Sequence, residues 1–257
     1  DEDGGDAGPD EAPTLRVELR VPATTARQIA PRTSLLIGMT LFAALSTGLG
    51  LAFVFEYLDD TIRSKEDFDR YVGLPLLGFV PRISVRDHEN PDLAAESRPG
   101  SAVAEAFRTI RTSIVFSRGD HPVRTMLVTS AGPGEGKTTI ASNLAAAFAR
   151  QKGPVLLVDA DLRKPRVAKA LGLPNERGLT NVLVGDATLA EVVQPASVDG
   201  LYVVTSGPIP PNPAELLHGD AMAALLRDAV AGYERVVLDT PPLVAVTDAR
   251  VLAGQVD

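Results

Sequence analysis

The sequence predicts an α/β domain with a mostly parallel sheet and helices on both faces, preceded by one transmembrane helix. Apolar strand-like runs alternate with helical patterns, which is the order expected for such a sheet. A Gly-rich turn joins the first of these strands to a helix, and an uncharged run of 22 residues precedes the domain. The expected strands lie near 124–129, 155–159, 201–205 and 235–239, and the expected helices near 101–117, 138–151 and 213–230.

Composition excludes several classes of function. The chain has no cysteine, so disulfide frameworks, zinc–thiolate sites and thiol catalysis are excluded. Its net charge of −8 is uneven: residues 1–99 carry 10 Lys/Arg against 17 Asp/Glu, and residues 100–257 carry 15 against 16. The second part therefore lacks the basic face of a nucleic-acid-binding protein, and we expect no nucleic-acid partner.

The N-terminal third contains the membrane segment. Residues 1–33 begin with an acidic, Gly/Pro-rich stretch and are expected to be a partly disordered extracytoplasmic remnant. Residues 34–55 (SLLIGMTLFAALSTGLGLAFVF) carry no charge, and as a helix they would span the ~30 Å hydrocarbon layer. A buried helix of a soluble protein is the alternative, but apolarity on all sides over this length is rare outside membranes. A cleaved signal peptide has a shorter apolar run closer to the start.

Residues 56–99 are expected to be a cytoplasmic juxtamembrane segment and linker. The stretch EYLDDTIRSKEDFDRYVG predicts a charged amphipathic helix, and Leu74–Pro81 predicts a short strand. Residues 82–100 are polar and interrupted by proline, which favours a linker. The domain itself is expected over residues 100–257.

A phosphate-binding loop is predicted between the first strand and its helix. The segment AGPGEGKT at 131–138 matches the P-loop pattern with alanine at its first position. Its glycines let backbone N–H groups surround a phosphate, and the following helix presents its positive end to the anion. A Gly-rich turn without a ligand is the alternative, but the flanking strand and helix favour a P-loop NTPase-type fold. The expected nucleotide-binding residues are Gly132, Pro133, Gly134, Glu135, Gly136, Lys137, Thr138 and Thr139.

Three aspartates follow two later strands. Asp159 and Asp161 come at the end of VLLV, and Asp239 ends RVVL. Because the carboxyl ends of parallel strands face the ligand crevice, we expect these carboxylates near the phosphates, where they suit magnesium. A strand-end Asp alone is more often a cap or turn residue. The basic residues Arg163, Lys164, Arg166 and Lys169 come next, and a solvated turn and helix face is the favoured interpretation over phosphate contacts.

These motifs resemble those of the bacterial tyrosine kinases of exopolysaccharide and capsule export, which are built on a Wzz-type chain-length-determinant membrane module. SAGPGEGKTT is similar to the Walker A motif of that family, VLLVDADLRKP to its Walker A′ motif and VVLDTPP to its Walker B motif. The stretch FEYLDDTIRSKEDFDRYVGLPLLGFVP resembles the junction inside the family's second membrane helix, and PPNPAELL resembles another family segment. The resemblance covers nearly the whole chain.

The resemblance implies phosphoryl transfer from ATP to a tyrosine hydroxyl, with Mg²⁺ as cofactor. Lys137 and the surrounding loop would hold the phosphates. Thr138 and Asp161 would ligate magnesium, with Asp239 acting directly or through water. Asp159 would orient the tyrosine and accept its proton, and the division of roles between Asp159 and Asp161 stays open. The expected catalytic residues are Lys137, Asp159 and Asp161.

The resemblance also implies partners. Glu105, Arg108 and Arg111 recur at three-residue steps, similar to the family's ring-forming motif, and fall opposite an apolar helix stripe. A solvated face with one Glu–Arg pair is the alternative; the resemblance favours a homo-oligomer. Other partners implied are the polysaccharide export machinery, a tyrosine phosphatase and the plasma membrane. Because ATP is cytoplasmic, residues 56–257 are placed inside the cell.

The sequence departs from the family pattern in two respects and leaves two rival functions open. The family's terminal tyrosine cluster is not seen before Asp257, and Asp1 is no natural initiator, so we expect a fragment truncated at both ends. A septum-site or plasmid-partition ATPase is one rival, but such proteins carry an extra lysine where Gly132 stands and lack a membrane span. A non-catalytic chain-length regulator, in which ATP only sets assembly, is the other.

Overall fold

A computed structural model describes residues 30, 32–59, 68, 73–83, 90–117, 122–151, 153–244 and 246–257. The chain divides into two compact units, Asp1–Phe68 and Asp69–Asp257. Most of the expected N-terminal remnant and of the expected amphipathic helix after the membrane segment lies outside the described residues.

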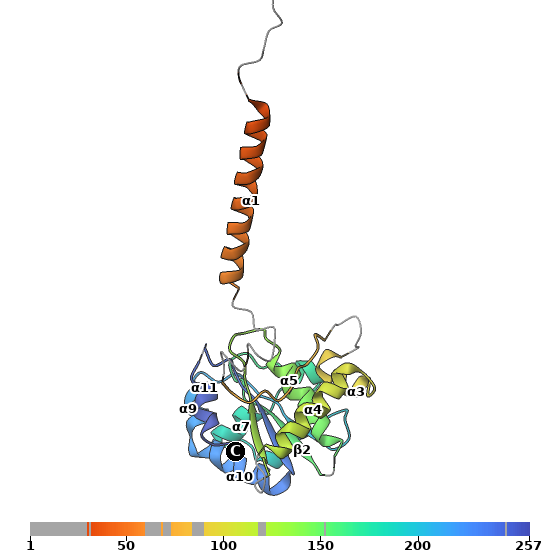
Figure 1. Cartoon of the computed structure of the whole chain (residues 1–257). Helices are drawn as coiled ribbons and strands as arrows, with labels where there is room; N and C mark the ends of the chain where they lie inside the picture. The colour runs from red at the N-terminus through yellow and green to blue at the C-terminus, as the bar shows by residue number, and fades with distance from the viewer. Residues whose placement is uncertain are drawn as a thin grey trace, which may run out of the picture. The chain divides into compact units, whose positions relative to one another are not determined.

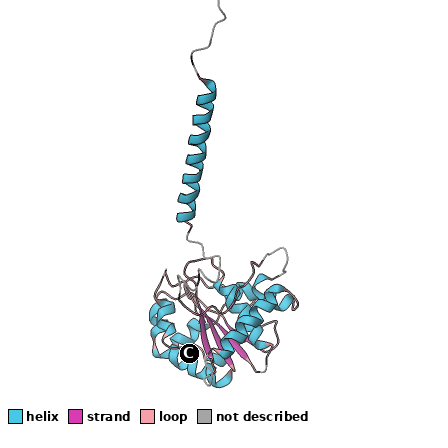
Figure 2. Cartoon of the chain, in the orientation of Figure 1, coloured by secondary structure: helices cyan, strands magenta, loops and turns pink. Residues whose placement is uncertain are grey.

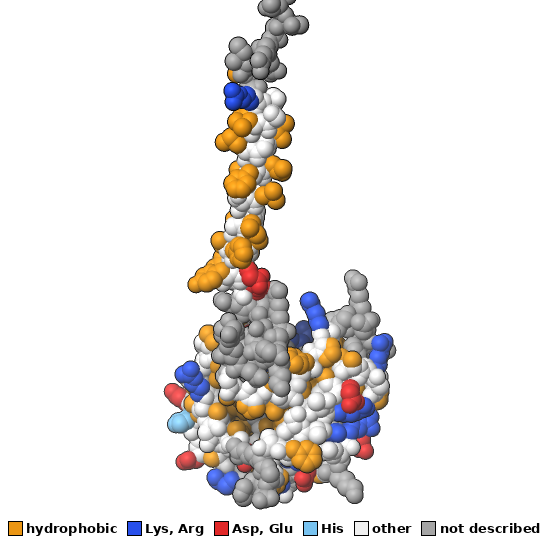
Figure 3. Space-filling model, in the orientation of Figure 1, with side chains coloured by type: hydrophobic (Ala, Val, Ile, Leu, Met, Phe, Trp, Pro, Cys, Tyr) orange, Lys and Arg blue, Asp and Glu red, His pale blue; other side chains and the backbone are white. Residues whose placement is uncertain are grey.

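The first unit contains helix α1, Thr33–Tyr57, which is 25 residues long (Figure 1). At ~1.5 Å per residue it is about 37 Å long, enough to cross a bilayer. Apolar side chains project from it along its length (Figure 3), and none of its residues is buried. Within the described part of the chain, α1 is the helix with the length and apolarity of a membrane span.

The second unit is built on a five-stranded sheet in the order β1-β5-β2-β4-β3. The pairs β1–β5, β5–β2 and β2–β4 are parallel, and only the short β3 runs antiparallel to its neighbour. The strands are β1 Thr125–Val128, β2 Val155–Asp159, β3 Gln194–Pro195, β4 Leu201–Val204 and β5 Arg235–Asp239. The mostly parallel α/β sheet and its four expected strands are therefore confirmed.

Helices cover both faces of this sheet (Figure 2). Alternate residues of β2 point to opposite sides: Val155 and Leu157 pack with α4 and α5, whereas Leu156 and Val158 pack with α7, α9 and α10. The helices are α4 Ala102–Phe116, α5 Lys137–Ala149, α6 Val167–Leu171, α7 Leu179–Val184, α8 Leu189–Val192, α9 Pro213–His218, α10 Asp220–Gly232 and α11 Asp248–Ala253.

One expected helix is divided in two. The pattern at 213–230 predicts a continuous helix, but the backbone of Gly219 is extended, with φ −73° and ψ 162°. Glycine carries a high entropic cost within a helix, so α9 ends at His218 and α10 begins at Asp220. Both helices still bury apolar side chains on the same face of the sheet, among them Leu217 and Leu225.

The approach to the domain differs from the sequence prediction. Residues 73–83 form no strand, so the strand predicted at Leu74–Pro81 is wrong. The linker interpretation of 82–100 is wrong for Asn90–Ser97, which we call the clasp. It contains a 3₁₀ turn, η1 Pro91–Leu93, and helix α3 Ala94–Ser97. Leu93 and Ala94 are buried in the core beside α5, because their apolar side chains pack against residues far along the chain, which the local sequence does not reveal.

Candidate active site

The predicted phosphate-binding loop lies between β1 and α5, at the carboxyl end of the sheet. Gly134 and Gly136 adopt φ values of 82° and 89°, a left-handed conformation that residues with a Cβ rarely take. The Glu135 carboxylate accepts hydrogen bonds from the backbone N–H groups of Ala131 and Gly132, both at 3.0 Å. Glu135 therefore braces the loop on itself, and α5 begins directly after it at Lys137.

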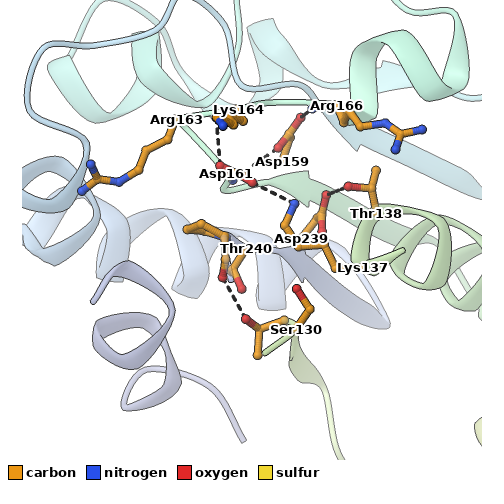
Figure 4. A network of polar contacts seen from close by, with 12 residues as sticks. Ser130, Lys137, Thr138, Asp159, Asp161, Arg163, Lys164, Arg166, Asp239 and Thr240 are labelled. Carbon is orange, nitrogen blue, oxygen red and sulfur yellow. Dashed lines mark hydrogen bonds and ion pairs between the residues drawn. The ribbon is translucent and has the colours of Figure 1, made fainter. Parts of the chain in front are cut away.

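The first two residues of α5 contact two of the predicted aspartates (Figure 4). The Thr138 hydroxyl donates to Asp239 Oδ2 at 2.6 Å in a buried contact. Lys137 Nζ lies 2.8 Å from Asp161 Oδ2, and these two side chains are only 14% and 3% exposed. The ammonium, the hydroxyl and the carboxylates predicted from separate motifs thus converge at one place.

Sheet pairing explains why the aspartates meet. In the β2–β5 register Asp159 stands opposite Asp239, and β1, which leads into the phosphate-binding loop, borders β5 on its other side. Asp159 is held by backbone N–H groups: Oδ2 accepts from Arg166 at 3.1 Å and Val167 at 2.9 Å. The other oxygen, Oδ1, accepts from the backbone N–H of Asp161 at 3.3 Å.

Burial makes these carboxyl groups hard to ionise. Burial is the main effect that raises the pKa of Asp159 to about 7, and the neighbouring Asp239 raises it further, against the lowering effect of the backbone hydrogen bonds. Burial likewise raises the pKa of Asp239 to about 6, although the hydrogen bond from Thr138 and the charge of Lys137 oppose the rise. The carboxyl groups at the ends of β2 and β5 can therefore take up and release protons near neutral pH.

One buried oxygen indicates where a cation would fit. Asp239 Oδ1 is buried and has no hydrogen-bond partner among the residues that the structure describes, although buried polar atoms are nearly always paired. Within the described residues, no group of three or more His, Cys, Asp or Glu side chains is arranged to hold a metal. The aspartates alone therefore do not form a complete set of metal ligands. A magnesium ion here would need phosphate oxygens to complete its octahedral coordination.

A cavity of about 430 Å³ opens beside the loop. One wall comes from the loop and the start of α5, and the other from residues 80–83, where the predicted strand meets the predicted linker, and from Pro91 of the clasp. Its lining residues are Val80, Pro81, Arg82, Ile83, Pro91, Gly134, Glu135, Gly136, Thr139 and Ile140. The cavity therefore borders the predicted phosphate-binding loop directly.

Comparisons with known proteins identify the family. The family model of the AAA domain matches residues 123–254. The tyrosine-protein kinase YwqD of Bacillus subtilis is 48% identical over 166 residues, which cover 65% of this chain and 70% of that protein. The chain belongs to the bacterial tyrosine kinases. The resemblance inferred from the motifs is confirmed, and neither rival function is favoured.

Other members of the family agree in sequence and fold. Etk of Escherichia coli K12 is 39% identical over 196 residues, which cover 76% of this chain but only 27% of that protein. The kinase domain of E. coli ETK superposes with a TM-score of 0.71 at 34% identity, covering 76% of this chain and 80% of that one. The chimerical protein CapA2B2 gives 0.70 at 38% identity, covering 75% and 82%.

Of the three residues expected to mediate ring formation, two are exposed and one is half-buried. Glu105 and Arg108 are exposed and pair with each other at 2.8 Å. Arg111 is half-buried, and its guanidinium donates to the backbone oxygen of Ala147 on α5 at 2.7 Å. Arg111 thus makes one contact within its own chain, and a role of the three side chains in self-association stays a prediction.

Two ion pairs near the kinase site were missed by sequence reasoning. Arg163 forms a bidentate pair with the fully buried Asp248, at 2.7 and 3.1 Å. Arg166 Nη2 lies 3.6 Å from Asp92 of the clasp. The solvated-face interpretation is therefore incomplete for these two arginines, while Lys164 and Lys169 of the same run are exposed. Neither acidic partner carries a local sequence signal, because each is distant from its arginine along the chain.

Proposed function

We propose that this chain transfers the γ-phosphoryl group of ATP to tyrosine hydroxyls and thereby regulates the polymerisation and export of an extracellular polysaccharide. The observation that carries the proposal is the convergence of Lys137 and Thr138 with three strand-end carboxylates in a member of the tyrosine-kinase family. Phosphoryl transfer depends mainly on positioning and charge neutralisation, and this cluster offers both.

The phosphates would be held by the backbone of Gly132–Thr139 and by the Lys137 ammonium. Phosphate oxygens would compete with Asp161 for that ammonium, which now lies 2.8 Å from it. Once released, the Asp161 carboxylate would join the Thr138 hydroxyl and the unpaired oxygen of Asp239 as ligands for magnesium. Bound magnesium would supply neutralisation of the charge that develops on the phosphates.

The acceptor proton has a suitable destination. In the reaction the tyrosine oxygen bonds to the γ-phosphorus, the bond to the bridging oxygen breaks, and its electron pair leaves with ADP. The phenolic proton passes to Asp159, directly or through one water molecule. A base works best when its pKa lies near the operating pH, and burial raises the pKa of Asp159 to about 7.

The family assignment and α1 together support a location. We place α1 in the plasma membrane and residues 56–257 in the cytoplasm, where ATP is available. Self-association would use the exposed Glu105–Arg108 face of α4. The polysaccharide export machinery and a tyrosine phosphatase complete the proposed partners, as the family resemblance implies.

Transfer of labelled phosphate tests the proposal. The full chain in detergent is incubated with γ-labelled ATP, Mg²⁺ and a Glu–Tyr copolymer as acceptor. We expect labelled tyrosine from the wild type, at least ~100-fold less from Lys137→Met, and wild-type labelling from Lys169→Met, a matched change at an exposed lysine of α6. Release of free phosphate without labelled tyrosine would indicate an ATPase instead and would overturn the proposal.

A further inference from the structure

Residues 82–100 were expected to be a linker, yet the clasp within them contacts two elements of the kinase site. On α5, the Asn143 side chain donates to Pro91 O at 3.1 Å and accepts from Ala95 N at 2.8 Å. On α6, the backbone oxygen of Ala170 accepts from the Asn90 side chain at 2.9 Å. The clasp therefore joins the helix that follows the phosphate-binding loop to the helix that follows the Asp159–Asp161 segment.

Asp92 is the acidic residue at the centre of the clasp. Its side chain is only 9% exposed, which is costly for a carboxylate unless it is paired. Three interactions hold the residue: its Oδ1 accepts from the Thr139 hydroxyl, its Oδ2 lies 3.6 Å from Arg166, and its own N–H donates to Asn90 at 2.9 Å. One carboxylate thus links the phosphate-binding loop to the Walker A′ segment.

Both partners of Asp92 belong to the site. Thr139 is in the third position of α5, directly after Lys137 and Thr138. Arg166 donates its backbone N–H to Asp159 while its guanidinium faces Asp92. The charge of the Arg166 guanidinium also affects Asp239. Burial raises the pKa of Asp239, and Arg166 is among the groups that oppose the rise. A displacement of Arg166 would therefore act on both strand-end aspartates.

We infer that Asp92 is a positioning residue for phosphoryl transfer, which fixes Thr139 and Arg166 relative to each other and so keeps the Asp159 segment aligned with the phosphate-binding loop. The inference deepens the proposed function and rests on it. Asp92 need not contact ATP or tyrosine in this role. Its effect is on alignment, where a displacement of about 1 Å can lower a rate up to ~100-fold.

Asp92→Ala in the full chain tests the inference in the labelled-phosphate assay. At saturating Mg-ATP we expect kcat to fall about tenfold, while KM for ATP and the Kd for Mg-ADP stay within about threefold. Asp92→Asn keeps an acceptor for Thr139 but loses the charge that faces Arg166, so we expect partial rescue, to within about threefold of the wild type. The Tm of each variant is measured by thermal unfolding, and the kinase assay is run well below the lowest Tm so that every variant is folded.

Glu96→Ala is the matched control. Glu96 lies in the same clasp and pairs with Arg150 at the far end of α5, away from the phosphate-binding loop, so its kcat should stay within about twofold of the wild type. A kcat for Asp92→Ala no lower than that of Glu96→Ala would overturn the inference. A loss shared fully by Asp92→Asn, or confined to nucleotide affinity, would also overturn it. If the wild type itself labels no tyrosine, the proposed function has failed instead.

Discussion

The substitution Asp159→Asn should stabilise the protein while it abolishes phosphoryl transfer. Asp159 is fully buried, and burial, with a contribution from Asp239, raises its pKa to about 7 from an ordinary value of 3.8. The folded protein therefore holds a proton that the unfolded chain has released above pH 4. Stability from this carboxyl group is complete below pH ~4 and is lost as the pH rises through about 7. Asparagine has no charge to bury, so it avoids that loss.

The magnitude follows from the same shift. About three pH units correspond to roughly 4 kcal/mol at pH 8 in nucleotide-free protein. Asparagine can accept the hydrogen bonds of Arg166 and Val167 with its one oxygen, but its NH₂ group then faces the N–H of Asp161, which costs about 1 kcal/mol. The net gain is about 3 kcal/mol, or roughly 6–12 °C in Tm for a domain of this size.

The assay is thermal unfolding of the full chain in detergent with EDTA, at pH 5 and pH 8. At pH 5 the unfolded chain has released the proton that the folded chain keeps, but only about one of the three pH units of stability has been lost, roughly 1–2 kcal/mol. The ~1 kcal/mol cost of the amide group offsets most of that, so Asp159→Asn should gain little at pH 5, whereas at pH 8 it should melt several degrees higher. Asp228→Asn, on the exposed side of α10, controls for a general effect of removing one negative charge. The reasoning is refuted if Asp159→Asn is no more stable than the wild type at pH 8, or if its gain is equal at both pH values.

Three further changes probe the site and its frame. Thr138→Ala leaves the buried Asp239 without its hydroxyl donor, so magnesium-dependent ADP affinity measured by calorimetry should fall at least ~10-fold, whereas Thr138→Ser should stay near the wild type. Gly178→Ala places a Cβ 2.1 Å from a backbone oxygen, so it should lower the free energy of unfolding in urea by more than about 3 kcal/mol. Arg163→Lys cannot form the bidentate pair with buried Asp248, and should lower that energy by about 1–3 kcal/mol.

Each of these predictions has an outcome that contradicts it. Equal ADP affinity for Thr138→Ala and Thr138→Ser would show that the hydroxyl is no ligand. Gly172→Ala is the control for Gly178, because Gly172 has open space around its added Cβ and only a strained φ of 67°; an equal loss in both variants would remove the steric explanation. An unchanged unfolding curve for Arg163→Lys would mean that the bidentate geometry contributes nothing.

The sequence alone determined the elements that local chemistry specifies. The glycines of the phosphate-binding loop, the uncharged run of α1 and the apolar strands ending in aspartate each follow from a few adjacent residues. Their backbone and burial demands favour one structural interpretation over its alternatives. The fold class, the family and the grouping of Lys137 and Thr138 with the strand-end carboxylates could therefore be predicted from the sequence.

Only the tertiary structure decided which distant residues meet. The pairing of β5 between β1 and β2 sets Asp239 against both Thr138 and Asp159. The raised pKa values follow from burial, which no single segment shows. The sequence of the clasp predicted a polar linker. The residues that dock it, Asp92 and Leu93, have their partners on α5 and near α6, far along the chain. Short polar segments carry too little local preference to reveal a docking site, since their conformation is fixed by side chains far along the chain.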